Sequence, residues 1–324
     1  MNTVRKLLKN FNQNIDLIEN ESLSQHTTFK VGGCADFFAA PHTIEDFIHF
    51  SVFLVQNNIR FFVLGGGSNL VFSDQGFRGV ILSTEKLNQI EILDEAGNIC
   101  SPDDLQKKEE EEGKTFYLRC GAGVKMADLS AFCADHALKG FAPFAGLPGT
   151  AGGACFMNAR CYGSEVADLL QNTKYFDFST LSIKEYIFSP ADWAYKVSPF
   201  QQNGGIILQS TFKVCTGKKA DIIEESCKNI EDRKQKGHFS YPSAGSVFKN
   251  NRNFGMPSGK IIEEAGLKGT SIGAAQIAPW HGNFIINNGG ASASQIKELV
   301  DFTKAKVEEK TGFQLECEVI FVDN

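Results

Sequence analysis

The sequence predicts an α+β protein with three domains. At 324 residues, the chain is longer than one hydrophobic core usually supports. Stretches with helical spacing of apolar residues alternate with short strand-like stretches, and glycine-rich turns separate them. A content of 42% hydrophobic and 22% charged residues is that of an ordinary globular protein. We expect the domains to comprise residues 1–85, 86–216 and 217–324.

The composition argues against several classes of protein. No apolar run approaches the ~20 residues that span a bilayer. A formal charge of -6 argues against a nucleic-acid-binding surface, although a small anionic ligand needs only a few local cations. The nine cysteines have neither a C-x-x-C pair nor a matched histidine spacing, which predicts reduced thiols, no metal site and a cytoplasmic protein.

The first third of the chain predicts helix, strand, glycine-rich turn and strand. Met1–Asn20 lacks the features of a signal peptide, and we interpret it as an amphipathic helix. Residues 46–58 have helical spacing, with Phe47, Phe50, Leu54 and Val55 on one face. Strands are expected at 60–64 and 79–82.

The middle and the end of the chain also mix helices and strands. Residues 97–113 are polar and acidic, and we interpret them as a hairpin loop without a catalytic role. The remaining expected elements are helices at 126–138, 221–234 and 294–310, strands at 174–178, 183–188, 206–214 and 315–322, and a loop followed by a strand at 241–249.

The run Gly65-Gly66-Gly67-Ser68-Asn69 follows a predicted strand. Consecutive glycines can turn several backbone N–H groups toward one point, which suits a phosphate, but a simple glycine-rich hairpin is as common. The next residues, Leu70 to Phe72, continue as a strand, whereas dinucleotide-binding and Walker loops open a helix. A nucleotide here is therefore expected to be bound by neither of those motifs.

A second glycine-rich segment runs from Gly146 to Asn158. Small residues there permit a flat ligand to approach the backbone, although a tight loop between packed elements is the better explanation of the segment when it is taken alone. Together, the two segments could hold the diphosphate and the ring of one large cofactor.

Five segments in order resemble the UDP-N-acetylenolpyruvoylglucosamine reductases, in their shorter class. They are His26–Gly33 (HTTFKVGG), Leu64–Leu70 (LGGGSNL), Gly146–Gly153 (GLPGTAGG), Tyr241–Asn250 (YPSAGSVFKN) and Ser258–Gly269 (SGKIIEEAGLKG). The resemblance covers nearly the whole chain, from Leu23 to Val322.

The resemblance implies FAD bound by the first two domains, in the fold of vanillyl-alcohol-oxidase-type flavoproteins, and a third domain that binds the UDP sugar. NADPH would be the electron donor, and neither nucleic acid nor a membrane is an expected partner. The implied FAD-binding residues are Leu64, Gly65, Gly66, Gly67, Ser68, Asn69 and Leu70 at the diphosphate, and Pro148, Gly149, Thr150, Gly152 and Gly153 near the ring. The implied substrate-binding residues are Tyr195, Lys249 and Asn250.

The resemblance also implies a mechanism. NADPH reduces FAD and leaves, and hydride then passes to C3 of the enolpyruvyl group. Ser246 would protonate C2 as the general acid, while Glu318 and a cation, here Lys196, would stabilise the charge that develops. Glu316 lies two positions from Glu318 and is expected on the same strand face. For His26 we expect a structural hydrogen bond.

Two positions depart from the family pattern. Lys196 stands where the family usually has arginine, and Arg160-Cys161 stands where it commonly has Gly-Ala. If the backbone at 160 has a positive φ, Arg160 is strained by ~1 kcal/mol or more. Otherwise its charge could serve the cofactor or the substrate. The alternatives to the reductase are another FAD oxidoreductase of the same cofactor fold and a binding protein that has lost turnover.

Overall fold

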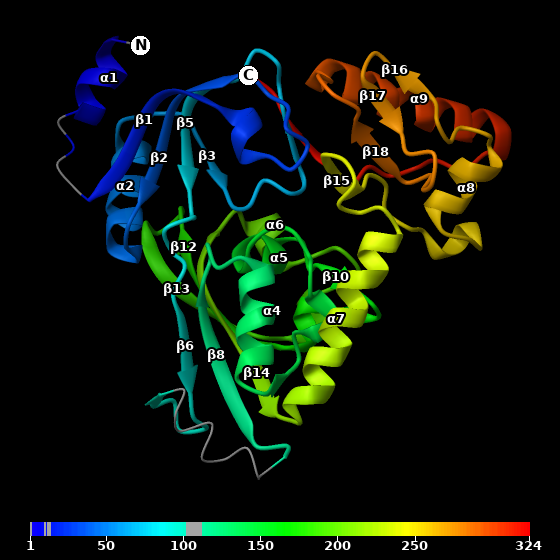
Figure 1. Ribbon diagram of the computed structural model, residues 1–324. Coiled ribbons are helices and arrows are strands. Elements are labelled where there is room, and N and C mark those ends of the chain that lie inside the picture. Colours follow the sequence, from blue (N-terminus) through cyan, green and yellow to red (C-terminus); the bar gives the residue numbers. More distant parts are fainter. Residues whose placement is uncertain (1, 10, 12–13, 102–111) are drawn as a thin grey trace. The chain divides into compact units, whose positions relative to one another are not determined.

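The described chain forms two compact units. The computed structural model describes residues 2–9, 11, 14–101 and 112–324 (Figure 1). Unit 1 is drawn from 1–17, 38–66 and 80–231, and unit 2 from 18–37, 67–79 and 232–324. Both units contain helices and strands, which confirms the α+β class. The three-domain division stays a prediction.

Unit 1 contains a large antiparallel sheet, with strands in the order β13-β12-β14-β8-β6-β7 and with β9 paired to β14. The strands are β6 (Ile90–Leu93), β7 (Ile99–Cys100), β8 (Thr115–Gly121), β9 (Leu138–Lys139), β12 (Leu170–Asp177), β13 (Ser182–Ile187) and β14 (Ile206–Thr216). The three strands expected between 174 and 214 are confirmed as β12, β13 and β14. The sequence analysis missed β6 and β8.

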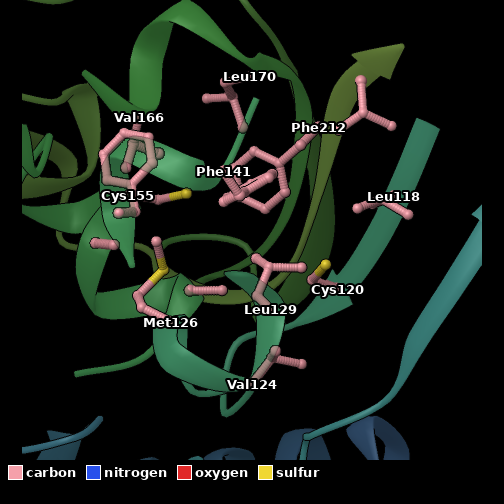
Figure 2. Packing of buried hydrophobic residues seen from close by; sticks show 14 of the residues in the cluster. Leu118, Cys120, Val124, Met126, Leu129, Phe141, Cys155, Val166, Leu170 and Phe212 are labelled. Atoms are coloured by element: carbon pink, nitrogen blue, oxygen red, sulfur yellow. The ribbon is translucent and has the colours of Figure 1, made fainter. Parts of the chain in front are cut away.

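Two helices supply much of the core of unit 1. Met126 and Leu129 of α4 (Met126–Asp135) and Cys155 of α5 (Ala151–Phe156) join Leu118 of β8 and Phe212 of β14 in one apolar cluster (Figure 2). Burial raises the pKa of the Cys155 thiol to about 12, so this sulfur packs as an apolar group.

All nine cysteines lie among the described residues, and none of them forms a disulfide there. Among the described residues, no helix is long and apolar enough to cross a membrane.

Further elements complete unit 1. Helix α2 (Ile44–Gln56) begins after Thr43, whose hydroxyl oxygen accepts the Asp46 N–H, and it buries three of the four expected residues, while Val55 is half-buried. The strand β3 (Phe61–Leu64) pairs in parallel with β5 (Phe77–Ser83). Unit 1 also contains β10 (Arg160–Cys161), β11 (Ser164–Glu165), α6 (Pro199–Asn203) and most of α7 (Lys219–Gln235).

The prediction of one helix over Met1–Asn20 was wrong beyond Lys9. Helix α1 ends there (Asn2–Lys9), and Ile15–Ser22 forms the strand β1. Ile15, Leu17 and Glu19 are less exposed than their neighbours, and this alternation is that of a strand. The strand joins a sheet with the order β1-β2-β5-β3, in which β2 is Cys34–Pro41.

The acidic stretch at 97–113 lies mostly outside the described residues, which exclude 102–111. Of its described part, Ile99 and Cys100 form β7, which pairs with β6 through a turn at Asp94–Asn98. The expected loop was therefore wrong at Ile99 and Cys100, which form a strand, and its part at 102–111 lies outside the described residues.

Unit 2 has an antiparallel sheet in the order β15-β18-β17-β16 and a parallel pair, β4 with β19. Its elements are β4 (Leu70–Phe72), β15 (Ser243–Ser246), α8 (Ser258–Glu264), β16 (Ser271–Ile272), β17 (Ala275–Ile277), β18 (Phe284–Asn287), α9 (Ala293–Thr311) and β19 (Ile320–Val322). The terminal strand expected at 315–322 is only β19, with an isolated bridge between Phe248 and Cys317 before it.

The loop after β4 holds the start of α9. The Asp74 carboxylate accepts the backbone N–H groups of Ala293 and Ser294 at 2.7 and 2.9 Å. Burial alone would raise the pKa of Asp74, but these two donors outweigh it and the pKa is lowered. Ser292 and Gln295 form a capping box at the same end. Backbone N–H groups at the start of α9, the longest described helix, are therefore bound both by Asp74 and by the capping box.

Two histidine rings pack on one phenylalanine in unit 2. The rings of His238 and His281 lie 4.7 and 4.4 Å from that of Phe284. Burial lowers the pKa of His238 to about 4, and the positive charges of Arg233 and Lys236 and the neighbouring His281 add to the effect. Burial also lowers the pKa of His281. Both rings are therefore neutral at pH 7.

This packing predicts a loss of stability in mild acid. An unfolded histidine takes up a proton below about pH 6.5, whereas folded His238 does so only near pH 4. The contribution of neutral, buried His238 to the free energy of unfolding is therefore complete above pH 6.5, and it decreases as the pH falls toward 4. His238→Phe keeps a ring against Phe284 and removes the titrating group, so its thermal midpoint should fall less than that of the native protein between about pH 7 and 5. Equal falls would contradict this account.

Candidate functional site

The two glycine-rich loops meet in unit 1. A Cβ atom on Gly66 would lie 2.6 Å from the Cα of Gly149, and one on Gly65 would lie 2.9 Å from the Thr150 Oγ1. Such separations leave no room for a side chain, so the two backbones pack directly on each other. The structure therefore brings together the two segments that were expected to bind one cofactor.

The second loop is held by the segment that precedes α4. Met126 N–H donates to the Gly149 carbonyl at 3.0 Å, and Ala151 N–H donates to the Val124 carbonyl at 2.7 Å. Thr150 caps α5 by accepting the Gly153 N–H. A Cβ on Gly153 would meet only the Thr150 Oγ1, at 3.5 Å, so one side of this glycine is open. Pro148, two residues before Thr150, is exposed.

The last part of the first loop, Gly67 to Asn69, belongs to unit 2. Gly67 has a φ of +60°, and a Cβ there would lie 1.9 Å from the His26 carbonyl oxygen. Only glycine fits this position. The His26 ring bonds the Glu21 carboxylate at 2.9 Å, which bears out its expected structural role.

Ser246 and Glu318 lie on neighbouring segments of unit 2. Ser246 is exposed at the end of β15, where it pairs with Phe284. The Glu318 N–H donates to the Val247 carbonyl at 2.7 Å. The Asn69 side chain donates to the Glu318 carbonyl at 2.9 Å, so the first glycine loop reaches the same place. The structure therefore brings together three residues that are far apart in sequence.

Lys249 and Asn250 have structural partners. The Lys249 ammonium lies 2.6 Å from the Glu316 carboxylate. The backbone N–H of Lys249 donates to the Glu316 carbonyl. The Asn250 side-chain oxygen accepts the N–H of Ser258, the first residue of α8. Their predicted role in substrate binding stays a prediction.

Asn283 has a structural role that was not predicted from the sequence. Its buried side chain accepts the Phe248 N–H at 2.9 Å and donates to the Phe248 carbonyl at 2.8 Å. Its carbonyl accepts the Val247 N–H, and its own N–H donates to the His281 Nδ1 at 3.1 Å. The residues after Ser246 are therefore held by an amide that mimics a neighbouring strand. A lone asparagine beside the apolar run Phe284 to Ile286 was the only signal in the sequence.

Tyr195 and Lys196 occupy the tip of a four-residue turn in unit 1. Ala194 and Val197 exchange two backbone hydrogen bonds, at 3.2 and 3.0 Å. Lys196 has a backbone φ of 60°, a left-handed conformation that residues other than glycine seldom adopt. Both residues are half-buried.

Arg160 is not strained, so that alternative was wrong. It lies in β10, and the positive φ angles on either side belong to Asn158 and Tyr162. Its guanidinium lies 3.5 Å from the Glu165 carboxylate, its partner in the strand pair β10-β11. The charge of Arg160 is therefore directed to a carboxylate of the protein itself.

The described part of the chain has no group of three or more His, Cys, Asp or Glu side chains that could hold a metal ion.

Comparison with protein families gives two matches. Residues 35–179 match the family described as FAD binding domain, and residues 235–322 match the C-terminal domain of UDP-N-acetylenolpyruvoylglucosamine reductase. The first match includes both glycine-rich loops, and the second includes Ser246 and Glu318.

Several proteins with this name match the chain over nearly their full length. The UDP-N-acetylenolpyruvoylglucosamine reductase of Treponema denticola is 45% identical, covering 91% of this chain and 90% of that protein. That of Borreliella burgdorferi is 38% identical over 98% of each. The crystal structure of the enzyme from Thermus caldophilus has a TM-score of 0.73 and 27% identity, and covers 96% of this chain and 99% of that one. The chain therefore belongs to the UDP-N-acetylenolpyruvoylglucosamine reductase family.

Proposed function

We propose that this protein catalyses the NADPH-dependent, FAD-mediated reduction of UDP-N-acetylenolpyruvoylglucosamine to UDP-N-acetylmuramate, a step in peptidoglycan precursor synthesis. The observation that carries the proposal is the direct packing of Gly65 and Gly66 on Gly149 and Thr150, within the region that matches an FAD-binding family. A cytoplasmic location is proposed with it, where thiols stay reduced, because none of the nine cysteines forms a disulfide among the described residues.

The residues at the two loops fit FAD. The Gly65–Leu70 segment would bind the diphosphate through backbone N–H groups, as glycine-rich turns bind anions elsewhere. The Pro148–Gly153 segment, with its open side at Gly153, would lie along the ring. Bound there, FAD would accept a hydride from NADPH and transfer one to the substrate.

Residues of the chain itself would donate the proton and stabilise the charge that develops on the substrate. In the proposed roles, the exposed Ser246 hydroxyl donates a proton to C2 of the enolpyruvyl group, and hydrogen bonds to Val247 and Phe248 fix the backbone that carries it. Glu318 and Lys196 would stabilise the charge that develops at the reacting group. A serine hydroxyl is a weak acid, but a developing carbanion is a strong base.

The proposed function predicts two separable half-reactions for Ser246→Ala. In anaerobic stopped flow, NADPH should bleach the flavin of the native enzyme, and enolpyruvyl-UDP-N-acetylglucosamine should restore its colour. Ser246→Ala should leave bleaching nearly intact and slow recolouring by ~10²-fold or more, because it removes a positioned general acid. Ser243→Ala, on the same strand β15, is the matched control and should recolour at a rate close to native. Glu318→Gln should show the same selectivity as Ser246→Ala.

Three results would count against this assignment. Equal slowing of both half-reactions by Ser246→Ala would make Ser246 structural. Bleaching without recolouring in the native enzyme would favour a binding protein that has lost turnover. Recolouring only by oxygen would favour an oxidase.

Lys196 gives a second prediction in the same assay. Lys196→Ala removes the cation, and Lys196→Gly does so with a residue that suits the left-handed backbone. Both should slow recolouring by at least ~10-fold, with bleaching little changed. Lys196→Arg should match or exceed the native rate, because a guanidinium binds a carboxylate through two parallel hydrogen bonds. Lys184→Ala, on the exposed strand β13, serves as the control. Native recolouring by Lys196→Gly would refute this role.

A further inference from the structure

The turn that carries Lys196 is held by side chains from outside it. The Asn158 amide donates to the Ala194 carbonyl at 2.9 Å. The Gln201 amide donates to the carbonyl of Lys196 itself at 3.1 Å. The carbonyl groups of the first and third residues of the turn therefore accept hydrogen bonds from outside it, and these bonds restrict the backbone on both sides of the Lys196 side chain.

Both the nitrogen and the oxygen of the Asn158 side-chain amide form hydrogen bonds. It is fully buried, and the same nitrogen that binds Ala194 also donates to the Glu165 carboxylate at 2.7 Å. Its oxygen accepts the Ala167 N–H at 3.3 Å. Its φ of 41° is one that asparagine tolerates better than most residues. No other side chain supplies two donors and one acceptor at this length, since aspartate lacks the donors.

Glu165 links Asn158 to Arg160. One carboxylate oxygen accepts the Asn158 amide, and the other lies 3.5 Å from the Arg160 guanidinium. The side chains of Arg160 and Glu165 are 34% and 25% exposed, so this ion pair is weaker than the buried hydrogen bond. The unusual basic residue at position 160 is therefore linked to the turn of Lys196 through Glu165 and Asn158.

The same residues tie the turn to the second glycine loop. Helix α5 begins directly after Thr150 and ends at Phe156, whose carbonyl accepts both the Ser198 hydroxyl and the Gln201 amide at 2.7 Å. Asn158 follows two residues later, and its N–H donates to the Cys155 carbonyl. All these residues belong to unit 1. The position of Lys196 relative to Gly149 and Thr150 therefore depends on residues 156–158.

We propose that Asn158 is a positioning residue for Lys196, oriented by Glu165 and, more weakly, by Arg160. The proposal rests on the proposed role of Lys196 in the second half-reaction. It assigns no contact with substrate to Arg160, whose charge acts through the carboxylate beside it. It also connects the two departures from the family pattern, because an ion pair and two hydrogen bonds link the residue at 160 to the turn that carries the cation at 196.

The test is a double-mutant cycle in the recolouring assay. Asn158→Gly removes the amide and suits the positive φ, and it should slow recolouring by ~10-fold or more, because small displacements of a charged group are costly to catalysis. Glu165→Gln should slow recolouring less, and Arg160→Gly by no more than ~5-fold. Bleaching by NADPH and the affinity for FAD should be unchanged in all three.

A matched control separates positioning from a general loss of a buried amide. Asn229 is also buried in unit 1, and its side chain donates to the Ala142 carbonyl at 2.9 Å, but it has no bond to the turn. Asn229→Ala should recolour at a rate close to native, even if its thermal midpoint falls as far as that of Asn158→Gly.

The decisive comparison is made in the Lys196→Gly background. If Asn158 acts through Lys196, Asn158→Gly should have little further effect there, and the two changes should not add. Full additivity would overturn the proposal while leaving the role of Lys196 intact. A native recolouring rate in Lys196→Gly alone would instead refute the proposed role of Lys196. If Asn158→Gly does not fold, Glu165→Gln replaces it in the cycle with the same required outcome.

Discussion

The backbones of the two glycine-rich loops lie in direct contact, and this contact constrains much of unit 1. A Cβ on Gly66 would lie only 2.6 Å from the Gly149 Cα, so a side chain at this position would push the two loops apart. The first loop ends β3, and the second starts α5, which packs into the core beneath the large sheet. In the proposed site, this contact lies where FAD would meet backbone N–H groups, and helix α5 leads from it toward Asn158.

Unit 2 uses a comparable device around Ser246. Val247 and Phe248 are bound on one side by Asn283 and on the other by residues 316–318, so the backbone after Ser246 has partners on both edges. In both units a buried asparagine side chain forms hydrogen bonds with backbone groups outside the regular strand pairing. Such an amide satisfies backbone groups at an irregular position without adding a charge that would have to be paired.

The sequence predicted the elements whose periodicity is strong. Helix α2 and helix α9 follow from regular apolar spacing, and β12 to β14 from β-branched and aromatic runs. Strand β1 was missed because Asp16, Glu19 and Glu21 hide a weak alternation. The glycine loops could be predicted as a pair because their composition is unusual. Their contact could not, since it depends on the absence of two Cβ atoms in the folded chain.

The roles of single polar residues were harder to predict. Glu165 follows Asn158 by seven residues and Ala194 follows it by 36, and nothing in their sequence neighbours indicates that the three side chains and backbone groups meet. Arg160 was misread in part for this reason, because its φ is set by a strand pair that ends at Glu165. Lys249 and Asn250 were expected to bind substrate from their motif, yet each has a partner within unit 2. Motifs indicate which residues matter, whereas packing decides what each one touches.

The central claim is that the contact between Gly66 and Gly149 builds the FAD site. The measurement that tests it most directly is the flavin released by acid from the purified native protein and from Gly66→Ala. The account predicts that the native protein is yellow and releases FAD rather than FMN, and that Gly66→Ala, which folds but separates the loops, retains far less. A colourless native protein that cannot be reconstituted with FAD, or a Gly66→Ala protein with full FAD content, would contradict it.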